Sequence, residues 1–207
     1  MPGEAFLRLR WRVGEGTWHD TPMQLVGSYN APNALAAIAV GVRYGVPESD
    51  IEAALSEYKP TNNRSELRRT SSNDLIVDAY NANPTSMAAS LQNFATIPHP
   101  HKRVILGEMG ELGTSRLQAH RDVLARLSGM NLECVWLVGE TWQAGYEQLN
   151  REVAQPVEDA GHSATEYRFF PDVTAVRAVL EQNKPSGCLI LIKGSNSVRL
   201  FTLPDFL

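Results

Sequence analysis

The chain has 207 residues, with 19 Lys or Arg, 23 Asp or Glu and a formal net charge of −4 at pH 7. No block of like charge stands out and no apolar run approaches the ~18 residues of a membrane helix, which argues against a nucleic-acid footprint, a polybasic membrane patch and a membrane span. We therefore expect a soluble protein whose partners are small molecules or proteins, with no nucleic acid and no membrane insertion.

The first element in chain order is a predicted β-hairpin. Residues 5–13 read AFLRLRWRV, in which apolar and basic residues alternate with the period of two that is typical of a half-buried strand. Gly14 and Gly16 turn the chain, and residues 17–26 are predicted to pair back as a second strand.

Two short helices are expected next, one behind Pro32 and one from Pro47. Helical spacing places the following residues on their inner faces: Ala34, Leu35, Ile38, Val42, Ile51, Ala54, Leu55 and Tyr58. Because a hairpin and two short helices make a poor domain on their own, we expect residues 1–58 to be the tail of a larger domain whose start is missing.

After this tail, strands and helices are predicted to alternate. Strands are predicted over residues 66–70, 75–79, 103–106, 134–138, 167–170 and 188–192, and helices from Pro84 and over residues 117–127, 142–149 and 172–181. Such alternation indicates right-handed crossovers and an α/β fold, namely a Rossmann-like, mostly parallel sheet of five or six strands with helices on both faces. We expect this second domain to span residues 59–207, with a boundary near residues 58–64.

The two cysteines favour a reducing compartment. Cys134 and Cys188 lie inside apolar runs far apart in the sequence, which suits buried thiols better than a disulfide framework. We therefore expect a cytoplasmic protein.

Four loops follow predicted strands, and ligands of such sheets bind outside the carboxyl ends of the strands. The loops are DAYNANP (78–84), GEMGELG (107–113), GETWQ (139–143) and KGSNS (193–197). For any one of them the plain alternative is loop chemistry, because Asn, Asp and Gly tolerate left-handed backbone and Pro begins helices. Four such loops at one sheet edge favour a binding site.

Other motifs for nucleotides and metals do not fit. KGSNS lacks the glycines that precede the lysine of a Walker A loop, and no G-x-G-x-x-G follows a strand. His99 and His101 flank Pro100 without nearby acid or thiol partners, so we predict no metal site there.

Several motifs, in the same order, resemble one known family. DAYNANPTSM, LGEMGELG with His120 downstream, LIKGS, YNAPNALAA and NNRS are similar to motifs in the carboxyl-terminal part of the Mur ligases. Within the family they most resemble the enzymes that add D-alanyl-D-alanine. The resemblance covers residues 27–195.

The resemblance implies a three-domain cytoplasmic enzyme of peptidoglycan synthesis, and thus of cell-wall formation, cell shape and cell division. ATP phosphorylates the carboxylate of UDP-MurNAc-tripeptide, and the amino group of D-Ala-D-Ala attacks the acyl phosphate. Residues 1–58 would then be the tail of the central ATPase domain, whose phosphate loop and Mg²⁺ ligands, like the amino-terminal domain, precede this chain. We therefore expect the chain alone to be inactive, with neither ATP nor Mg²⁺ bound.

The resemblance also implies a set of nucleotide-binding residues. Asn30 and Asn33 match the pair that holds adenine, and the residue before them, often histidine in the family, is Tyr29 here. Arg64 matches the arginine that reaches the ATP phosphates when the domains close, and Asp78 matches the strand-end acid that contacts the nucleotide. The alternatives are an N-cap cluster for the asparagines, a solvated arginine and a helix-capping carboxylate.

The dipeptide is expected to bind beside the nucleotide. Tyr80, Asn81 and Asn83 would shape its pocket, on what the resemblance implies. From their place at a neighbouring strand end, we expect Lys193 and Ser195 to bind its carboxylate, one by charge and the other by hydroxyl. These side chains should converge with Asp78 at one edge of the sheet.

Two other classes of function stay open. A diaminopimelate-adding or folylpolyglutamate-type ligase would share the fold, although the Asp-Asn-Pro-Arg stretch that favours the diaminopimelate type is absent. A non-catalytic, small-molecule binding module belongs to a different class, and a phosphate loop encoded upstream would exclude it. Glu108 stands where the family more often has aspartate, which leaves the role of GEMGELG open.

Overall fold

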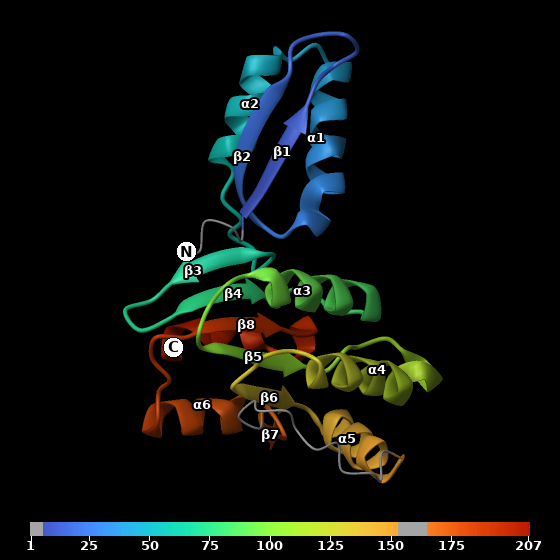
Figure 1. The fold of residues 1–207 in the computed structure, drawn as a ribbon, viewed down its shortest axis with the longest axis vertical. Helices are drawn as coiled ribbons and strands as arrows, with labels where there is room; N and C mark the ends of the chain where they lie inside the picture. Colours follow the sequence, from blue (N-terminus) through green and yellow to red (C-terminus); the bar gives the residue numbers. More distant parts are fainter. Residues whose placement is uncertain (1–5, 153–164) are drawn as a thin grey trace.

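Two separate sheets organise the chain in its computed structural model, which describes residues 6–152 and 165–207 (Figure 1). The first sheet pairs β1 (Phe6–Trp11) with β2 (His19–Val26) in antiparallel fashion, and the second has six strands. The predicted hairpin is thus confirmed, while Ala5, where its first strand was expected to begin, lies outside the described residues.

The hairpin and two helices form what we call the hairpin unit. Helices α1 (Ala31–Arg43) and α2 (Glu48–Glu57) lie along the hairpin (Figure 1). The core of this unit consists of Leu7, Trp11, Met23, Ala34, Ile38, Ile51 and Leu55. Leu35 was predicted to face this core, but the structure leaves it 49% exposed. The buried stripe of α1 passes through Ala34 and Ile38, and the next residue along a helix points about 100° away from such a stripe.

The second sheet begins with another hairpin and continues in parallel. Its strands are β3 (Glu66–Arg69), β4 (Asp74–Asp78), β5 (Lys102–Gly107), β6 (Cys134–Val138), β7 (Glu166–Phe170) and β8 (Leu189–Lys193). They lie in the order β3-β4-β8-β5-β6-β7, in which only the β3 and β4 pair is antiparallel. The predicted α/β, mostly parallel sheet is confirmed.

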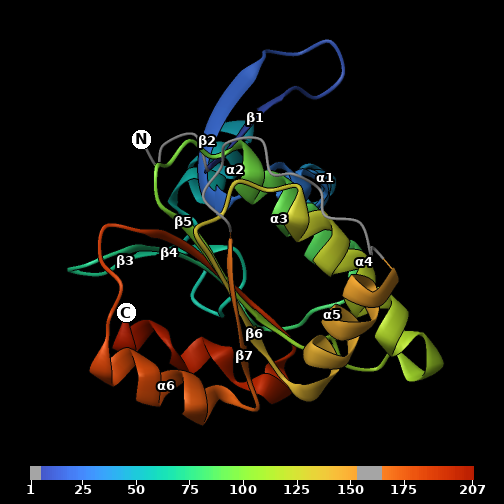
Figure 2. The same ribbon diagram turned by 60° about the horizontal axis from the view of Figure 1, so that its bottom comes forward.

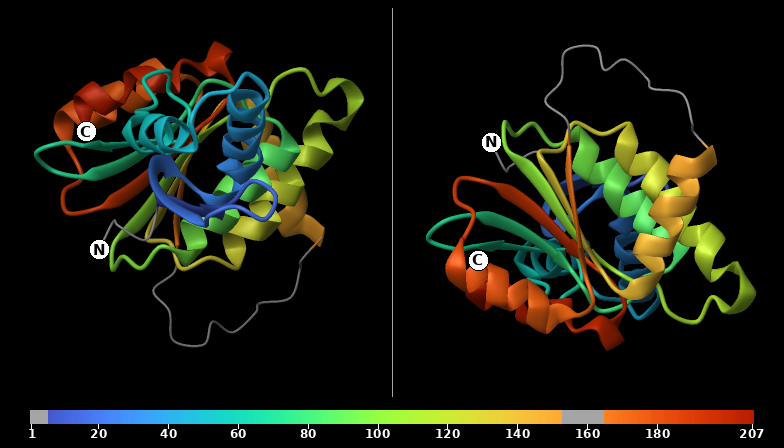
Figure 3. Two further views of the ribbon diagram at one scale, coloured as in Figure 1. Left: turned by 90° about the horizontal axis from the view of Figure 1, so that it is seen from above. Right: turned by 90° about the horizontal axis from the view of Figure 1, so that it is seen from below.

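Helices cover both faces of this sheet (Figures 2 and 3). One face carries α3 (Pro84–Thr96), α4 (Arg116–Ser128) and α5 (Glu140–Glu152). The other face carries α6 (Val173–Gln182) and the 3₁₀ turns near the carboxyl terminus, at Asn196–Val198, Leu200–Thr202 and Pro204–Phe206. Two further 3₁₀ turns, Ser28–Asn30 and Gly113–Ser115, precede α1 and α4.

Alternation along the strands divides the core between these two layers. In β4, Ile76 packs in the cluster that contains Phe94 and Trp142 from the α3–α5 layer. Its neighbours Leu75 and Val77 pack in the cluster that contains Leu180 from α6. Because both faces are covered, the inner strands are apolar through their middle residues, as expected for buried parallel strands, and their charged residues stand at the strand ends.

The sequence made predictions about the two cysteines and about membrane-spanning helices. Cys134 and Cys188 are free and buried, as the sequence predicted. Among residues 6–152 and 165–207, no helix combines the length and the apolar character needed to cross a bilayer.

Candidate functional site

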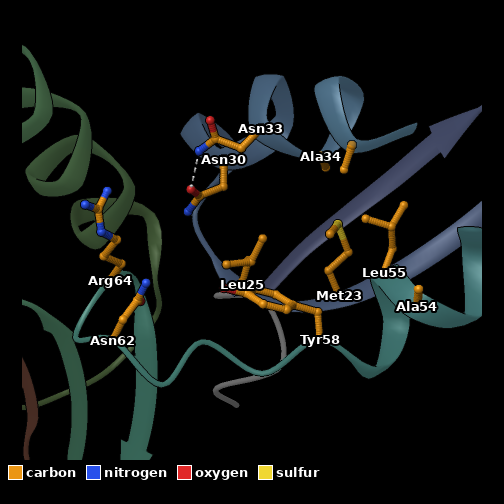
Figure 4. A pocket seen from close by; sticks show the side chains of 11 residues that line it. Met23, Leu25, Asn30, Asn33, Ala34, Ala54, Leu55, Tyr58, Asn62 and Arg64 are labelled. Carbon is orange, nitrogen blue, oxygen red and sulfur yellow. Dashed lines mark hydrogen bonds between the residues drawn. The ribbon is translucent and has the colours of Figure 1, made fainter. Parts of the chain in front are cut away.

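A pocket of about 420 Å³ opens between the hairpin unit and the segment that leads into the second sheet (Figure 4). Its lining residues are Met23, Leu25, Asn30, Asn33, Ala34, Ala37, Ala54, Leu55, Tyr58, Asn62 and Arg64. Figure 4 shows the amides and the guanidinium at one end and mainly apolar side chains at the other. Ala54 and Tyr58, which were predicted to face the core, are exposed because they face this pocket.

Asn30 and Asn33 form one hydrogen-bonded unit at the pocket wall. Asn30 is buried; its Nδ2 donates to the carbonyl of Val26 at 2.8 Å, and its Oδ1 accepts from Nδ2 of Asn33 at 3.1 Å. Asn30 occupies the N-cap position of α1 but makes no side-chain capping hydrogen bond there, so the capping alternative is wrong for this residue. Its side chain instead fixes the amide of Asn33 beside the pocket.

Residues 62–65, which we call the link, connect the two units in a constrained conformation. Asn63 and Ser65 have φ angles of 58° and 50°, in the left-handed region that non-glycine residues seldom adopt. Backbone hydrogen bonds hold them, because Ala79 N–H donates to the carbonyl of Asn63 at 2.9 Å and Val26 N–H donates to that of Ser65 at 3.1 Å. The surroundings therefore determine the backbone on both sides of Arg64.

Tyr29 fastens the hairpin unit to the link. Its hydroxyl lies 3.1 Å from Oγ of Ser65, and the N–H of Ser65 donates to Oδ1 of Asp78 at 3.2 Å. Burial and the nearby charge of Asp78 raise the pKa of Tyr29 to about 12, so the phenol stays protonated near neutral pH. Sequence reasoning treated Tyr29 only as a lost histidine and missed this contact. The only hint of this contact in the sequence is the motif NNRS, because its asparagines tolerate the left-handed backbone that the link adopts.

Arg64 extends from the link and lies over an aromatic ring. Its Cζ is 3.7 Å from the ring centroid of Tyr80, which is half exposed just after β4. Arg64 also lines the pocket that contains Asn33. The structure therefore joins a residue predicted for the nucleotide to one predicted for the dipeptide.

Asp78 and Lys193 meet at the ends of adjacent parallel strands, as expected from their places in the sequence. They are register partners in β4 and β8, and Nζ of Lys193 donates to Oδ2 of Asp78 at 2.6 Å. Lys193 is only 1% exposed. A buried ammonium requires such a partner, so its charge is already neutralised. This pairing argues against Lys193 binding a dipeptide carboxylate by charge, a role that stays a prediction.

Asn81 and Asn83 follow β4 and are both exposed at the same end of the strand. Oδ1 of Asn81 accepts from the N–H of Ala82 at 2.8 Å. Asn83 is the N-cap of α3: its Oδ1 accepts from the N–H of Ser86 at 2.8 Å, and Oγ of Ser86 accepts from the N–H of Asn83. The side-chain carbonyl of Asn83 is therefore used within the loop, whereas no acceptor in the described part of the chain takes a hydrogen bond from its N–H₂.

Ser195 packs against the loop after β5 and not directly against Asp78. Its N–H donates to the carbonyl of Glu108 at 3.0 Å, and its hydroxyl lies beside Gly110.

The side chain of Glu108 accepts from the N–H of Thr141 at 2.6 Å and pairs with Arg116. Burial alone would raise the pKa of Glu108, but these contacts outweigh it and lower the pKa. Glu108 thus joins the loop after β5 to the start of α5.

His120, on α4, holds the loop after β5 (residues 107–113) in place. Its ring is fully buried; Nε2 accepts from the N–H of Met109 at 3.1 Å, and Nδ1 lies 2.7 Å from the carbonyl of Arg116, to which it donates as the Nδ1–H tautomer. The ring also packs edge to face with Trp142, at 4.4 Å between centroids. Burial lowers the pKa of His120, which favours this neutral form. These contacts give the loop GEMGELG a structural role.

The described residues do not contain a preformed metal centre. Among residues 6–152 and 165–207, no group of three or more His, Cys, Asp or Glu side chains is placed to hold a metal ion. His101 contacts the carboxylate of Glu133 where β5 and β6 begin, which is the opposite end of the sheet from the site.

Comparison with known proteins defines the class to which this fold and site belong. The family described as "Mur ligase, glutamate ligase domain" matches residues 63–196, and the chain belongs to this Mur ligase family. It is 31% identical over 193 residues to the UDP-N-acetylmuramoyl-tripeptide–D-alanyl-D-alanine ligase of Treponema pallidum, an alignment that covers 93% of this chain and 39% of that protein.

Solved structures share the fold. MurF from Acinetobacter baumannii has a TM-score of 0.78 and 24% identity, with 98% of this chain and 42% of that chain covered. MurF from Thermotoga maritima, whose structure was determined in complex with ADP, has a TM-score of 0.67 and 19% identity, with 98% and 45% covered. The chain thus spans about two fifths of the length of these proteins.

Proposed function

We propose that this chain is the carboxyl-terminal part of an ATP-dependent amide ligase that joins D-Ala-D-Ala to UDP-MurNAc-tripeptide through an acyl phosphate. The single observation that carries the proposal is the pocket that Asn33 and Arg64 both line, with Arg64 lying over Tyr80, the residue just before Asn81. Membership of the Mur ligase family and similarity to D-alanyl-D-alanine ligases support it. The whole protein would act in peptidoglycan synthesis in the cytoplasm.

The pocket fits the base and the phosphates of ATP. Apolar side chains such as Met23 and Leu55 suit the faces of a purine, and the amide of Asn33 supplies a donor and an acceptor for its edge. The guanidinium of Arg64 suits phosphate oxygens because its donors form a fixed fork. The described residues contain no cluster of three or more His, Cys, Asp or Glu side chains that could hold Mg²⁺. We therefore assign the metal ligands and the phosphate loop to the rest of the protein.

Each residue of the site then has a defined task. When bound, ATP supplies the phosphoryl group that activates the carboxylate of the tripeptide. Asn33 orients the base and Arg64 compensates phosphate charge. Asp78 holds the link through the N–H of Ser65 and pairs with Lys193, and a contact with the nucleotide would use the 14% of its side chain that stays exposed. Asn81 and Asn83 hold the incoming dipeptide, and Ser195, which follows the adjacent strand β8, contributes its hydroxyl, so that the amine is placed for attack.

We also propose that residues 1–58 are the tail of a central ATPase domain and that residues 59–207 form the carboxyl-terminal domain. The hairpin unit has its own sheet and its own core, which supports this division. The amino-terminal and central domains of the same protein would be the main partners of this chain.

The test is an assay of the complete protein for ATP-dependent ligation. We expect phosphate release and a new amide when UDP-MurNAc-tripeptide and D-Ala-D-Ala are both present, with little turnover when L-alanine or glutamate replaces the dipeptide. Ligation of another amine to its own acceptor would favour the related Mur or folylpolyglutamate-type ligases. ATP binding without turnover on any of these substrates would favour a non-catalytic binding module.

A further inference from the structure

The contact between Arg64 and Tyr80 differs from the other cation–aromatic contacts in the described part of the chain. Cζ of Arg64 lies 3.7 Å from the centroid of the Tyr80 ring, whereas the other such contacts measure 4.8 to 6.0 Å. Within residues 6–152 and 165–207, no carboxylate pairs with Arg64. The aromatic ring is therefore its specific partner.

The backbone places these two side chains opposite one another. Ala79 N–H donates to the carbonyl of Asn63, and Ser65 N–H donates to Asp78, so two hydrogen bonds tie the link to the end of β4 on either side of Arg64. The left-handed φ angles of Asn63 and Ser65 are part of the same arrangement. Arg64 is consequently presented to the residue that follows Ala79, which is Tyr80.

An aromatic partner leaves the arginine able to bind a ligand. When an arginine lies over an aromatic ring, the flat face of its guanidinium is attracted to the ring. Its N–H donors then point outward, in the plane of the guanidinium. A carboxylate partner would instead occupy those donors. The ring also restricts the rotamers of the long arginine side chain. Less side-chain entropy is therefore lost when a ligand binds.

We propose that Tyr80 is a positioning residue that holds the guanidinium of Arg64 ready for the nucleotide phosphates. This inference rests on the proposed function, because it acts through the nucleotide role of Arg64. It moves Tyr80 from the dipeptide pocket, which the family resemblance implied for it, to the nucleotide side of the site.

The experiment is steady-state kinetics of the complete ligase with ATP and D-Ala-D-Ala varied separately. Tyr80→Leu removes the π face, and we expect the KM for ATP to rise about three- to tenfold while the KM for D-Ala-D-Ala stays within about twofold. Tyr80→Phe keeps the ring and should restore the KM for ATP to within about twofold of the wild type. In an Arg64→Ala background, Tyr80→Leu should have no further effect.

The outcomes separate this inference from the function on which it rests. If Arg64→Ala impairs the use of ATP but Tyr80→Leu does not, or if the two effects are additive, Tyr80 does not position Arg64 and the inference is overturned. A larger change in the KM for D-Ala-D-Ala than for ATP on Tyr80→Leu would overturn it too, and would return Tyr80 to the dipeptide pocket. If Arg64→Ala behaves like the matched control Arg126→Ala, an exposed arginine on α4, the nucleotide role of Arg64 fails and the inference fails with it.

Discussion

Asn83 has two tasks in one side chain, since its carbonyl caps α3 and its amide N–H₂ is proposed to hold the dipeptide. Replacement by alanine removes both, and loss of an N-cap costs about 0.5–2 kcal/mol of stability. Asn83→Asp keeps a capping oxygen and removes only the N–H₂ donors. In the complete ligase we expect both substitutions to raise the KM for D-Ala-D-Ala more than that for ATP, with thermal stability lowered mainly in Asn83→Ala. The reverse ranking of the two KM values would count against a dipeptide role.

The ion pair between Lys193 and Asp78 allows a second prediction for single residues. Removing one partner of a buried pair costs about 3–5 kcal/mol, and we expect Lys193→Met to lie near the lower limit because Asp78 keeps the N–H of Ser65. Urea unfolding of this chain measures the loss, and the double variant with Asp78→Asn should lose less than the sum of the single variants. An unchanged midpoint together with a raised KM for D-Ala-D-Ala would restore the dipeptide role that the sequence suggested for Lys193.

What the sequence can reveal about single residues depends on how far apart their partners lie. The motifs correctly brought Asp78 and Lys193 to one edge of the sheet, because strand ends follow from local patterns. Whether the ammonium is open or paired depends on a contact between residues 115 positions apart, which no local pattern contains. The same holds for Arg64 and Tyr80, whose contact requires the backbone of the link.

Among the elements, the junction of β2 with α2 is expected to respond to pH. His19 lies 2.8 Å from both Glu52 and Glu48, and hydrogen bonds to these carboxylates raise its pKa above 6.5. A group with a raised folded-state pKa stabilises fully below its unfolded pKa, and this stabilisation is lost as pH rises through the folded-state value. We therefore expect the Tm of the chain to fall above about pH 6.5 and His19→Gln to weaken that dependence.

The control for this experiment is His99→Gln, which changes a loop histidine far from α2. Its Tm profile should follow the wild type across the same pH range. If His19→Gln and His99→Gln gave the same profile, the junction of β2 and α2 would not be the source of the pH dependence.

Elements were predictable from the sequence where a pattern repeats over several residues. The alternation of strands and helices identified all six strands of the second sheet, since buried apolar runs bounded by loop residues are local features. The order β3-β4-β8-β5-β6-β7 could not be derived, because β8 inserts between β4 and β5 from the far end of the chain. Leu35 was misplaced because helical spacing gives the centre of a buried stripe more reliably than its margin.

For the molecule as a whole, we expect that this chain on its own turns over no ATP. Phosphoryl transfer depends on a phosphate loop and Mg²⁺, whereas the described residues offer the proposed nucleotide a base pocket, Arg64 and Asp78 but no group placed to hold a metal ion. The measurement is phosphate release by the purified chain with ATP, Mg²⁺, UDP-MurNAc-tripeptide and D-Ala-D-Ala. Turnover that vanished in Arg64→Ala would show that the chain is a complete catalyst.

The relation between the two units was only partly visible in the sequence. Its change of pattern near residues 58–64 led us to expect a boundary there, and that boundary stays a prediction. What the pattern could not contain is the way Tyr29, Ser65 and Asp78 fasten the units to each other, because this depends on side chains from three separate segments.

The two outer strands of the sheet have a consequence for how the protein behaves in concentrated solution. Among the described strands, β3 and β7 each pair with one neighbour, and the free edge of such a strand is where another chain could add a strand. Both carry charged residues in ion pairs, Arg68 with Glu66 and Arg168 with Glu166. Docking a second strand there would desolvate those charges, so the edges resist aggregation although the sheet between them is almost entirely apolar.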